Sequence, residues 1–490
     1  MTDLRFESQG IVLELDNSIP AVFETGNGAF LQISGHFIDP GFTIHSIQLV
    51  LHPPVHDTLG YVLVSRQKKG RIFGDDHSSS SRFFFAIPFR HNDPPVEITL
   101  EITRNDTSAL CFPLGTVTPA FRSHEISCSV SHLRISSYFK ENSSHPQYPP
   151  IVIGLATYNP DIELFTRQIQ SIREQDYPNW FCLINDDCSD LNSFQKILEI
   201  IGDDDRFLIL RNKQNLGFYK NFEKILQFIP ADTPYIALCD QDDRWYPDKL
   251  RRLVSAFDGK TLLTFSDMRI VDRNGKILFP SFWMNRTVHY QELDLQILDN
   301  TITGAACMFR GSLLNDILPF PPDAGTVFRN RKVAFHDHWI GCVALAKGKV
   351  RYIPEPLHDY YQQGQNCAGF YYHTHENGVK KSGTVLRKIR TDTPGKIVER
   401  AFVWFLTYGI QKILFAKILE MRIIPDEGEK REDIALFSSF QGLGVRMIYI
   451  LWRLRSRRDV SCDAEKIFFL GYITWRMFRR FLSRFSWSGR

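Results

Sequence analysis

Short runs rich in Val, Ile and Phe recur through the first 140 residues, and clusters of turn residues separate them. The apolar runs cover residues 11–15, 42–51, 61–64, 82–89 and 96–102. Their lengths and spacing are typical of a β-sandwich. The region shows no acid pair, metal-ligand spacing or nucleophile-base pattern, so we interpret it as a structural or sugar-binding accessory module, with positioning of an acceptor as the alternative. We predict an all-β sandwich over residues 1–140.

A different pattern follows a polar linker, rich in Ser and Pro, at residues 140–150. Apolar runs short enough to be single buried strands alternate with stretches whose apolar residues recur at helical spacing. The runs lie at 151–156, 180–184, 206–210 and 235–239, and the helical stretches at 165–172, 191–201 and 218–228. This alternation predicts a parallel, doubly wound α/β domain over residues 148–380, with ligands at the carboxyl ends of its strands. The Asn274-Gly275 pair predicts a hairpin, and with it antiparallel strands added after the fourth strand.

Residues 385–490 are predicted to form a helical, basic and aromatic region. Over 445–490 there are 11 Lys or Arg residues against 3 Asp or Glu. On a helix, an apolar stripe from Trp475 to Phe485 would lie beside arginines that step by four from Arg476. Such a helix can lie in the interface of an anionic membrane, and packing on the α/β domain with a solvated basic face is the alternative.

Composition narrows the class of protein. The chain has 490 residues, of which 43% are hydrophobic and 23% charged, and its net charge of +3 indicates no particular partner. Nine cysteines without a CxxC spacing argue against a zinc site or a disulfide framework and for a reducing compartment. The sequence shows no signal-peptide pattern, no run of 18 apolar residues and no nucleic-acid-binding motif. We therefore expect a cytoplasmic protein that can lie on the inner face of the cytoplasmic membrane and binds no nucleic acid.

Candidate chemistry concentrates where the predicted strands end. The fourth strand is followed by Asp240, Asp242 and Asp243, three carboxylates that repel one another unless a cation lies among them. Such ligands suit Mg²⁺ or Mn²⁺ held partly by a substrate diphosphate, and a solvated turn that caps the next helix is the alternative. The first strand is followed by ThrTyrAsnPro at 157–160 and the second by AsnAspAspCysSerAsp at 185–190. Together these groups would recognise a nucleoside diphosphate, although Asp and Asn are also common turn residues.

Six motifs occur in a fixed order through residues 148–370. They are ATYNP, INDDCSD, RNKQNLGFYKNFEKIL, IALCDQDDRWYPDKL, NTITGAACMFR and AFHDHWIGCVALAKGKVRYIPEPLHDYYQQGQN. In this order they resemble the family-two glycosyltransferases of the GT-A fold, and within them the bacterial rhamnosyltransferase-like enzymes of cell-surface polysaccharide synthesis. The resemblance is specific for fold and reaction class and much weaker for the sugar transferred.

The resemblance implies how the nucleotide would be bound. Tyr158 and the backbone of Ala156 would flank the pyrimidine base, and Asp187 would accept its N–H. Lys220 stands where relatives often have an arginine near the nucleotide. Asp240 would lie near the ribose and the metal.

The resemblance also implies the groups that act on the sugar. Asp242 would ligate the metal between the diphosphate oxygens, and Gly304 would let the backbone approach the donor sugar closely. Asp337, in HisAspHisTrp, matches the general base that takes the proton of the acceptor hydroxyl in an inverting displacement. The two histidines that flank it could tune or position it.

One departure from the family pattern concerns residues 360–364. Close relatives typically read TyrArgGlnHisGly, where this chain has Tyr361 and Gln363 in place of the arginine and the histidine. Both usual groups would help to hold the metal-bound diphosphate. His373 and His375 follow a few residues later and could replace the histidine, or they are solvated loop residues.

These observations predict an inverting, metal-dependent glycosyltransferase. The resemblance implies rhamnose from dTDP-rhamnose as the donor and a surface glycan or lipid-linked glycan as the acceptor. A UDP-hexose or UDP-N-acetylhexosamine donor is the alternative. A non-catalytic glycan-binding protein with a degenerate transferase domain is the alternative from another class.

Overall fold

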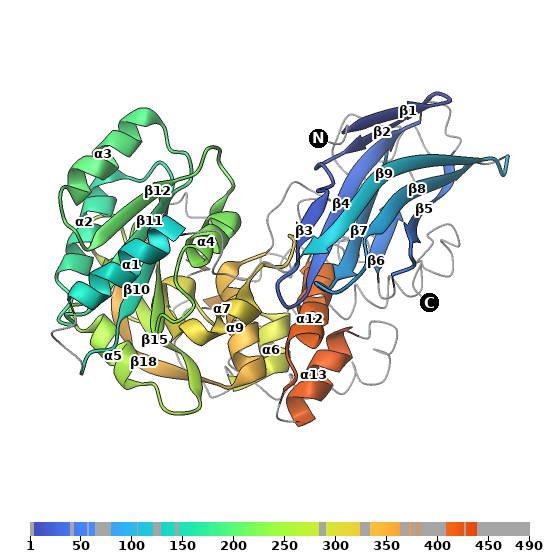
Figure 1. Ribbon diagram of the computed structural model, residues 1–490. Helices are drawn as coiled ribbons and strands as arrows, with labels where there is room; N and C mark the ends of the chain where they lie inside the picture. Colours follow the sequence, from blue (N-terminus) through green and yellow to red (C-terminus); the bar gives the residue numbers. More distant parts are fainter. Residues whose placement is uncertain are drawn as a thin grey trace.

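Two lobes, a β-sandwich and an α/β domain, lie side by side in the computed structural model of the chain, and helices of the C-terminal region lie between them (Figure 1). The structure describes residues 4–39, 44–55, 58–63, 80–104, 106–120, 129–142, 147–283, 291–323, 334–362, 372–373, 380–381, 408–425 and 428–438.

The N-terminal lobe packs two antiparallel sheets face to face. The first sheet has the order β1 (Arg5–Ser8), β2 (Ile11–Leu15), β4 (Ala29–Ile38), β7 (Ser80–Phe89), β6 (Leu59–Leu63). The second has the order β3 (Val22–Glu24), β9 (Ala109–Ala120), β8 (Val96–Arg104), β5 (Ile44–His52), and β3 alone pairs parallel to its neighbour. Alternate residues point into the core between the sheets, where Phe37 lies 5.4 Å from Phe83 and 5.8 Å from Phe112, measured between ring centroids.

The central lobe is built on one mixed sheet. Its order is β12 (Phe207–Arg211), β11 (Trp180–Asp186), β10 (Ile151–Thr157), β13 (Tyr235–Cys239), β17 (Cys307–Arg310), β15 (Thr261–Val271), β18 (Lys349–Tyr361), β14 (Arg244–Trp245). The first four strands run parallel, as the alternating pattern predicted. Because the fourth strand in sequence pairs with the first, the turns after β10 and β13 meet at one edge of the sheet.

The antiparallel additions to this sheet were also predicted. β17 runs antiparallel to both β13 and β15. The Asn274-Gly275 turn joins β15 to β16 (Ile277–Phe279), and Gly275 has a φ of +81°, which glycine adopts without strain. The hairpin prediction is confirmed.

Helices cover both faces of the central sheet (Figure 1). They are α2 (Ile162–Arg173), α3 (Leu191–Ile201), α4 (Phe218–Gln227), α5 (Lys249–Ser255), α6 (Leu293–Leu298), α7 (Leu314–Ile317) and α9 (His336–Lys347). The short helices η2 (Gly304–Ala306) and η3 (Gly311–Leu313) flank β17, and β19 (Tyr372–His373) pairs with β20 (Lys380–Lys381).

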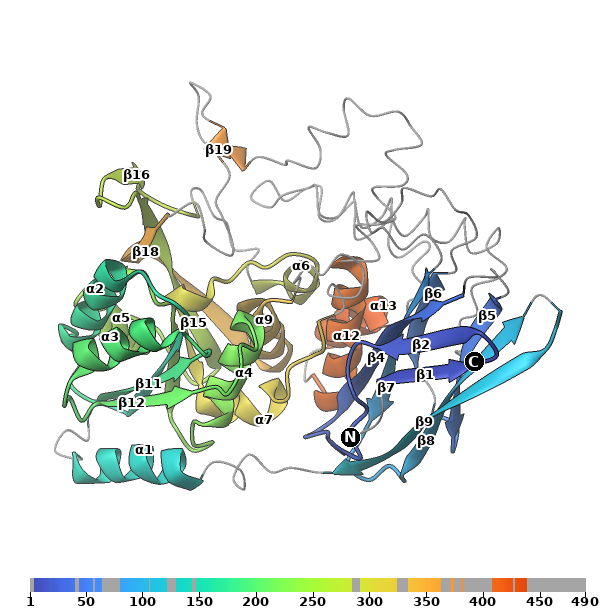
Figure 2. The same cartoon turned by 90° about the horizontal axis from the view of Figure 1, so that it is seen from above.

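Helix α1 (Ser129–Glu141) corrects the domain boundary expected at residue 140. The helix lies beside β11 and β12 of the central lobe (Figure 2). Its Tyr138 packs 5.1 Å from the ring of Phe181 on β11, and its Arg134 donates to the carbonyl of Asp205. The apolar face of α1 thus belongs to the α/β core, and the Ser- and Pro-rich stretch after it connects parts of one domain.

Helix α12 (Ile410–Arg422) is buried on almost every side. Together with α13 (Gly428–Ser438) it shares one hydrophobic core with the α/β domain, and this core extends to Phe30, Phe84 and Ala86 on β4 and β7 of the sandwich. Phe84 therefore points away from the sandwich core while Phe83 and Phe85 point into it, which explains three consecutive buried phenylalanines. None of the described helices is long and apolar enough to span a membrane.

Arg422, at the end of α12, joins three parts of the chain. Its guanidinium donates to the carbonyls of Gly28 in the sandwich (2.6 Å), Asp316 (2.8 Å) and Pro319 (2.7 Å) in the α/β domain. It also lies over the ring of Trp339, 5.6 Å from the centroid.

We predict that Arg422→Met lowers the free energy of unfolding by about 2–4 kcal/mol, because it leaves several carbonyls without a donor at a domain junction. Urea unfolding measures the change. Arg431→Met, at an exposed position on α13, is the matched control and should have little effect. Equal stability of the two variants would contradict the junction role.

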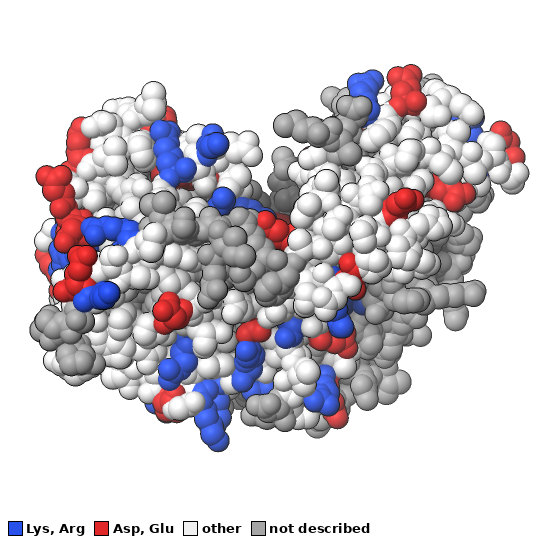
Figure 3. Space-filling model, in the orientation of Figure 1, with Lys and Arg blue, Asp and Glu red and all other residues white. Residues whose placement is uncertain are grey.

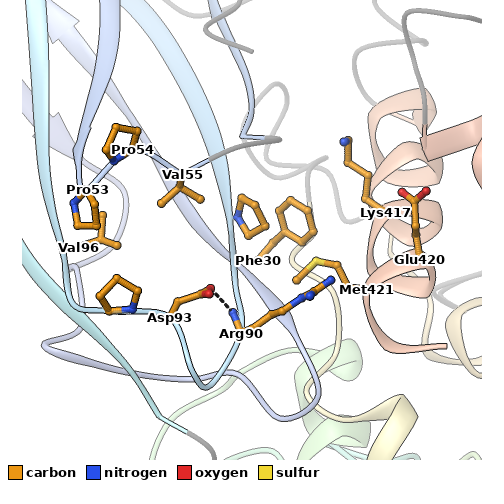
Figure 4. A pocket seen from close by; sticks show the side chains of 12 residues that line it. Phe30, Pro53, Pro54, Val55, Arg90, Asp93, Val96, Lys417, Glu420 and Met421 are labelled. Atoms are coloured by element: carbon orange, nitrogen blue, oxygen red, sulfur yellow. Dashed lines mark hydrogen bonds between the residues drawn. The ribbon is translucent and has the colours of Figure 1, made fainter. Parts of the chain in front are cut away.

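A cavity of about 390 Å³ lies between the sandwich and α12 (Figure 4). Phe30 and Met421 contribute apolar walls, and Arg90 and Lys417 reach it from the two sides. None of the residues predicted to bind the donor or to act as base lines it.

Candidate active site

The turn after β10 presents Tyr158, which is 47% exposed. The next residue, Asn159, has a φ of +40°, in the left-handed region that asparagine adopts more readily than most residues. Its amide donates to Ser189 Oγ (2.8 Å) and its Oδ1 accepts from the Asp190 amide (2.9 Å). The turns after β10 and β11 are therefore bound to each other. Ala156 packs half-buried beneath them.

Asp187 is buried, and its carboxylate already has partners within the protein. It accepts from the amides of Leu216 (2.8 Å) and Gly217 (2.7 Å) and from Asn212 Nδ2 (2.8 Å). These bonds fix the loop that leads into α4. A carboxylate has about four lone-pair sites, so only about one is left for the N–H of a base. Holding this loop accounts for Asp187 without a ligand, and its contact with a base stays a proposal.

Gln241, between the first two aspartates of the acidic cluster, was not singled out from the sequence. Its Oε1 accepts from Thr157 Oγ1 (2.9 Å) and from the Tyr158 amide (2.8 Å), and its Nε2 donates to the Tyr158 carbonyl (3.4 Å). One side chain thus connects the turn that carries Tyr158 to the acidic cluster, across more than 80 positions of sequence. Only the pairing of β10 with β13 reveals this role.

We predict that Gln241→Ala weakens nucleotide binding about tenfold, because the three hydrogen bonds that orient the Tyr158 turn are lost. Calorimetric titration with dTDP or UDP measures the effect. Gln195→Ala, on the exposed side of α3, is the control and should bind as the wild type does. Unchanged affinity in the Gln241 variant would show that the turn holds its shape without this side chain.

Asp240 and Asp242 are half-buried at the end of β13. Burial raises the pKa of Asp240 to about 6, with Lys249 opposing the shift. Burial and then the charge of Asp240 raise the pKa of Asp242 to about 7. Carboxylates with raised pKa values in one cluster are characteristic of sites that receive a cation or exchange a proton.

Asp243 does not cap the next helix, which was the alternative interpretation of the acidic cluster. Helix α5 begins after Asp248, whereas Asp243 is fully buried, with Oδ2 3.7 Å from His358 Nε2. The reason is the pairing of β14 with β18, which sets Trp245 opposite His358 and draws the preceding aspartate into the core. Burial and the neighbouring carboxylates hold the pKa of Asp243 well above its usual range.

Lys249 is a buried cation beside this cluster. Its Nζ donates to the Ala305 carbonyl (2.5 Å), lies 3.4 Å from His358 Nδ1, and lies over the ring of Trp245, 4.1 Å from the centroid. Burial lowers the pKa of Lys249 to about 8, and the charges of Asp243 and Asp240 oppose the shift. The lysine connects the acidic cluster to the η2 turn.

Asp337 binds the start of the same turn. Its Oδ2 accepts from the Gly304 amide (2.9 Å) and its Oδ1 from the His338 amide (2.8 Å). Burial raises the pKa of Asp337 to about 6, these hydrogen bonds oppose the shift, and the charge of Asp240 adds to it. A carboxylate with this pKa is ionised near neutral pH and can still accept a proton, as a general base must.

Packing against α9 requires a glycine at position 304. A Cβ at this position would lie 2.5 Å from His336 Nε2 and 3.3 Å from Asp337 Cβ. His336 stacks on Phe222 with ring centroids 3.7 Å apart, and burial lowers the pKa of His336 to about 3, so it stays neutral. Close packing against α9 thus explains the glycine, and an approach to a donor sugar remains an additional proposal.

Lys220 forms an ion pair with an acidic neighbour. Its Nζ lies 2.5 Å from Glu223 Oε2 on the same face of α4, and Glu223 also accepts from the Phe320 amide. The side chain is 48% exposed, so contact with a nucleotide requires the lysine to leave this pair or to share it.

The residues at the departure from the family pattern are only partly described. Tyr361 is buried against Leu164 and Val271, and the guanidinium of Arg167 lies over its ring, 4.5 Å from the centroid. Gln363 and His375 lie outside the described residues, and for His373 only the backbone is described, in β19.

The acidic cluster fits a divalent cation that a substrate helps to hold. Among the described residues no three His, Cys, Asp or Glu side chains form a complete metal cage. The oxygens of Asp243 nevertheless accept no hydrogen bond of ordinary length, and the buried Lys249 offsets the charges of Asp240 and Asp243 only in part. A metal bound by one or two carboxylates and by diphosphate oxygens suits this arrangement.

Comparison with known families agrees with this geometry. Residues 152–318 match the family model described as Glycosyl transferase family 2. This segment is a family 2 glycosyltransferase domain. The match covers β10 to α7, including the acidic cluster, and ends before α9 and Asp337. The resemblance of the ordered motifs to the family is thereby confirmed.

Known proteins resemble parts of this chain. A protein of Escherichia coli K12, provisionally named as the colanic acid biosynthesis glycosyl transferase WcaA, is 33% identical over 104 residues, 21% of this chain and 36% of WcaA. The E. coli UDP-Glc:alpha-D-GlcNAc-diphosphoundecaprenol beta-1,3-glucosyltransferase WfgD is 28% identical over 134 residues, 26% of this chain and 51% of WfgD. The chain spans about half or less of these relatives. The crystal structure of Staphylococcus aureus TarS 1–349 with UDP-GlcNAc aligns at 14% identity and a TM-score of 0.37, over 68% of this chain and 92% of TarS 1–349.

Proposed function

We propose that this chain is an inverting, metal-dependent glycosyltransferase that transfers a sugar from a nucleotide donor to a glycan. The observation that carries the proposal is the position of the η2 turn. Lys249, beside the acidic cluster, donates to the Ala305 carbonyl of this turn, and Asp337 accepts from the Gly304 amide. A sugar bound at the turn would therefore lie near both the groups for its diphosphate and a base.

The protein's own residues divide the work of the displacement. The acceptor hydroxyl oxygen attacks the anomeric carbon, and Asp337 takes the hydroxyl proton as the new C–O bond forms. The bond between that carbon and the diphosphate oxygen breaks, and the nucleoside diphosphate leaves with the electron pair. Asp242, supported by Asp240, would hold Mg²⁺ or Mn²⁺, which neutralises the departing diphosphate when bound. Tyr158 would stack on the base, and Asp187 and Lys220 would contact the nucleotide.

For the donor we propose dTDP-rhamnose, on the resemblance of the ordered motifs to rhamnosyltransferase-like enzymes. The names of the two relatives support a role in cell-surface polysaccharide synthesis and an acceptor that can be lipid-linked, and the name of WfgD supports UDP-glucose as the second candidate donor.

The proposed location is the cytoplasm or the inner face of the cytoplasmic membrane. On the face shown in Figure 3 the described Lys and Arg side chains lie among Asp and Glu rather than in one patch. The basic stripe over 445–490 that would contact anionic lipid lies outside the described residues.

A donor screen tests this function. Thermal unfolding is followed with dTDP-rhamnose, UDP-glucose and UDP-N-acetylglucosamine, each with and without Mn²⁺. A donor at 100 times its Kd should stabilise the fold by about 2.7 kcal/mol, and only with the metal. Donor hydrolysis then confirms turnover. If only a UDP-sugar stabilises the fold, that nucleotide sugar replaces dTDP-rhamnose as the proposed donor. Glycan binding without hydrolysis of any donor would favour the non-catalytic glycan-binding protein.

A further inference from the structure

Lys412 brings a positive charge from the C-terminal region into the core of the α/β domain. It lies on α12, is only 8% exposed, and its Nζ is 3.2 Å from Nδ1 of His338, the residue after the proposed base. Among the described residues no carboxylate lies within 4.0 Å of this ammonium, although the charge of Asp299 acts on it. A buried lysine without a close anion destabilises a fold, so its presence calls for a role beyond filling space.

The hydrogen bonds of His338 determine its tautomer. Its Nε2 lies 2.5 Å from the carbonyl oxygen of Gln296 on α6. Because a carbonyl can only accept, Nε2 carries the proton, and the lone pair of Nδ1 faces Lys412 as an acceptor. Burial, followed by the charge of Lys412, holds the pKa of His338 well below its usual range, so the ring stays neutral. The Gln296 carbonyl therefore fixes the proton on Nε2, and Lys412, by donating to Nδ1, holds the orientation of the ring.

Hydrogen bonds of Gln296 link His338 to the segment that donates to Asp337. The side chain of Gln296 donates to the carbonyl of His338 (3.2 Å) and to Asn300 Oδ1 (3.2 Å). Its Oε1 accepts from the amide (2.9 Å) and the hydroxyl (2.6 Å) of Thr301. Asn300 in turn makes a side-chain hydrogen bond to Asp337. The segment 300–304 thus carries two donors to the base, Asn300 and the Gly304 amide, and Gln296 and His338 hold its start.

We propose that Lys412 is a positioning residue for the Asp337 base, acting through His338 and Gln296. The inference rests on the proposed function. It makes α12 part of the catalytic apparatus, although this helix lies outside residues 152–318 that match the family. Lys412 does not touch the reacting atoms; it holds the donors that orient the carboxylate of Asp337.

The test compares the steady-state kinetics of Lys412→Met with those of the wild-type full chain, using the donor found in the screen. Methionine keeps most of the side-chain volume and removes the charge. We expect kcat to fall about 10- to 100-fold with the donor KM unchanged, because a base misplaced by a fraction of an ångström loses rate and not affinity. Gln411→Met, which removes a buried hydrogen bond from the same helix to the Pro322 carbonyl, is the control and should keep kcat.

A double variant separates positioning from a general loss of stability. If Lys412 acts through His338, Lys412→Met should lower kcat no further in a His338→Gln background. Additive losses, or an unchanged kcat in Lys412→Met, would overturn the proposal. Lys412→Gln, whose amide can still donate to Nδ1, should recover most of kcat and is the variant to use if the methionine protein does not fold. If Lys412→Gln does not recover kcat and Gln411→Met is as impaired as Lys412→Met, helix α12 has only a structural role.

A readout without turnover distinguishes this inference from the function on which it rests. In ¹⁵N-histidine spectra the wild type should show His338 as the neutral Nε2–H tautomer, assigned by its absence in His338→Gln. Because Lys412 donates to Nδ1, a changed Nδ1 chemical shift in Lys412→Met would support the contact even if no donor were turned over. A wild type that is inactive with every donor would count against the proposed function, and an unchanged His338 signal in Lys412→Met would count against the inference.

Discussion

Asp337→Asn is expected to abolish sugar transfer while donor binding persists. Asparagine has nearly the same shape but cannot take the proton of the acceptor hydroxyl, and removal of a general base typically costs about 10²–10⁴-fold. We expect a loss of at least about 10³-fold in kcat, measured as release of the nucleoside diphosphate with acceptor present. The single side-chain oxygen of asparagine can still accept from the Gly304 or the His338 amide, so affinity for the donor should change little.

The pH profile of the wild type gives an independent check on the same residue. Burial raises the pKa of Asp337 to about 6. Below that pH the carboxyl is protonated and cannot act as a base, so with Mn²⁺ saturating at every pH kcat/KM should fall as the pH drops through about 6 and stay level above it. Asp316→Asn, at a buried aspartate that pairs with Lys347 away from the η2 turn, should keep both rate and profile. Full transfer by Asp337→Asn would refute its role as base.

Asp242→Asn is expected to abolish both transfer and metal-dependent nucleotide binding. An amide is a far weaker ligand than a carboxylate for a hard cation, and Asp242 is the residue assigned to hold the metal against the diphosphate. Titration with dTDP or UDP in the presence of Mn²⁺ should show the metal-dependent gain in affinity lost, and transfer reduced by about 10³-fold. Asp337→Asn and Asp242→Asn should therefore both lose sugar transfer, but only Asp242→Asn should lose metal-dependent nucleotide binding.

Asp242→Asn should also increase the free energy of unfolding in the absence of metal. The pKa of Asp242 is about 7 in the fold against 3.8 for an exposed aspartate, so the folded state binds more protons than the unfolded state between those values. Stability of the wild type should thus fall as the pH rises through this range, and Asp242→Asn should remove that part of the loss. Asp248→Asn, at the start of α5, is the control for both assays because its carboxylate faces Arg251 and Arg252. Metal-dependent binding retained in Asp242→Asn would exclude Asp242 as the ligand.

The central domain was predictable because its signals are local. Strands β10 and β13 are buried almost throughout, so residues 151–156 and 235–239 read as unbroken apolar runs, and the amphipathic helix 191–201 coincides with α3. The acidic cluster and the Tyr158 turn were found for the same reason, since residues at strand ends keep their polar character whatever surrounds them.

The environment of each site residue was not predictable. Nothing in the order of the residues shows that Asp243 enters the core beside His358, or that Gln241 reaches Tyr158. The boundary expected at residue 140 was wrong because the Ser- and Pro-rich stretch reads as a linker, whereas the preceding helix α1 buries Tyr138 against Phe181. In each case partners far apart in sequence supply the deciding contact.

The sequence by itself determined the parallel α/β domain, the ligand edge of its sheet, and the residue types that can hold a metal diphosphate or act as a base. Tertiary structure alone decided how these residues are charged and held: burial raises the pKa values of Asp240, Asp242 and Asp337, Lys249 joins the acidic cluster to the η2 turn, and α12 sets Lys412 behind the base. The physical reason is that hydrophobic periodicity is written along the chain, whereas desolvation and charge interaction depend on which distant segments are packed together.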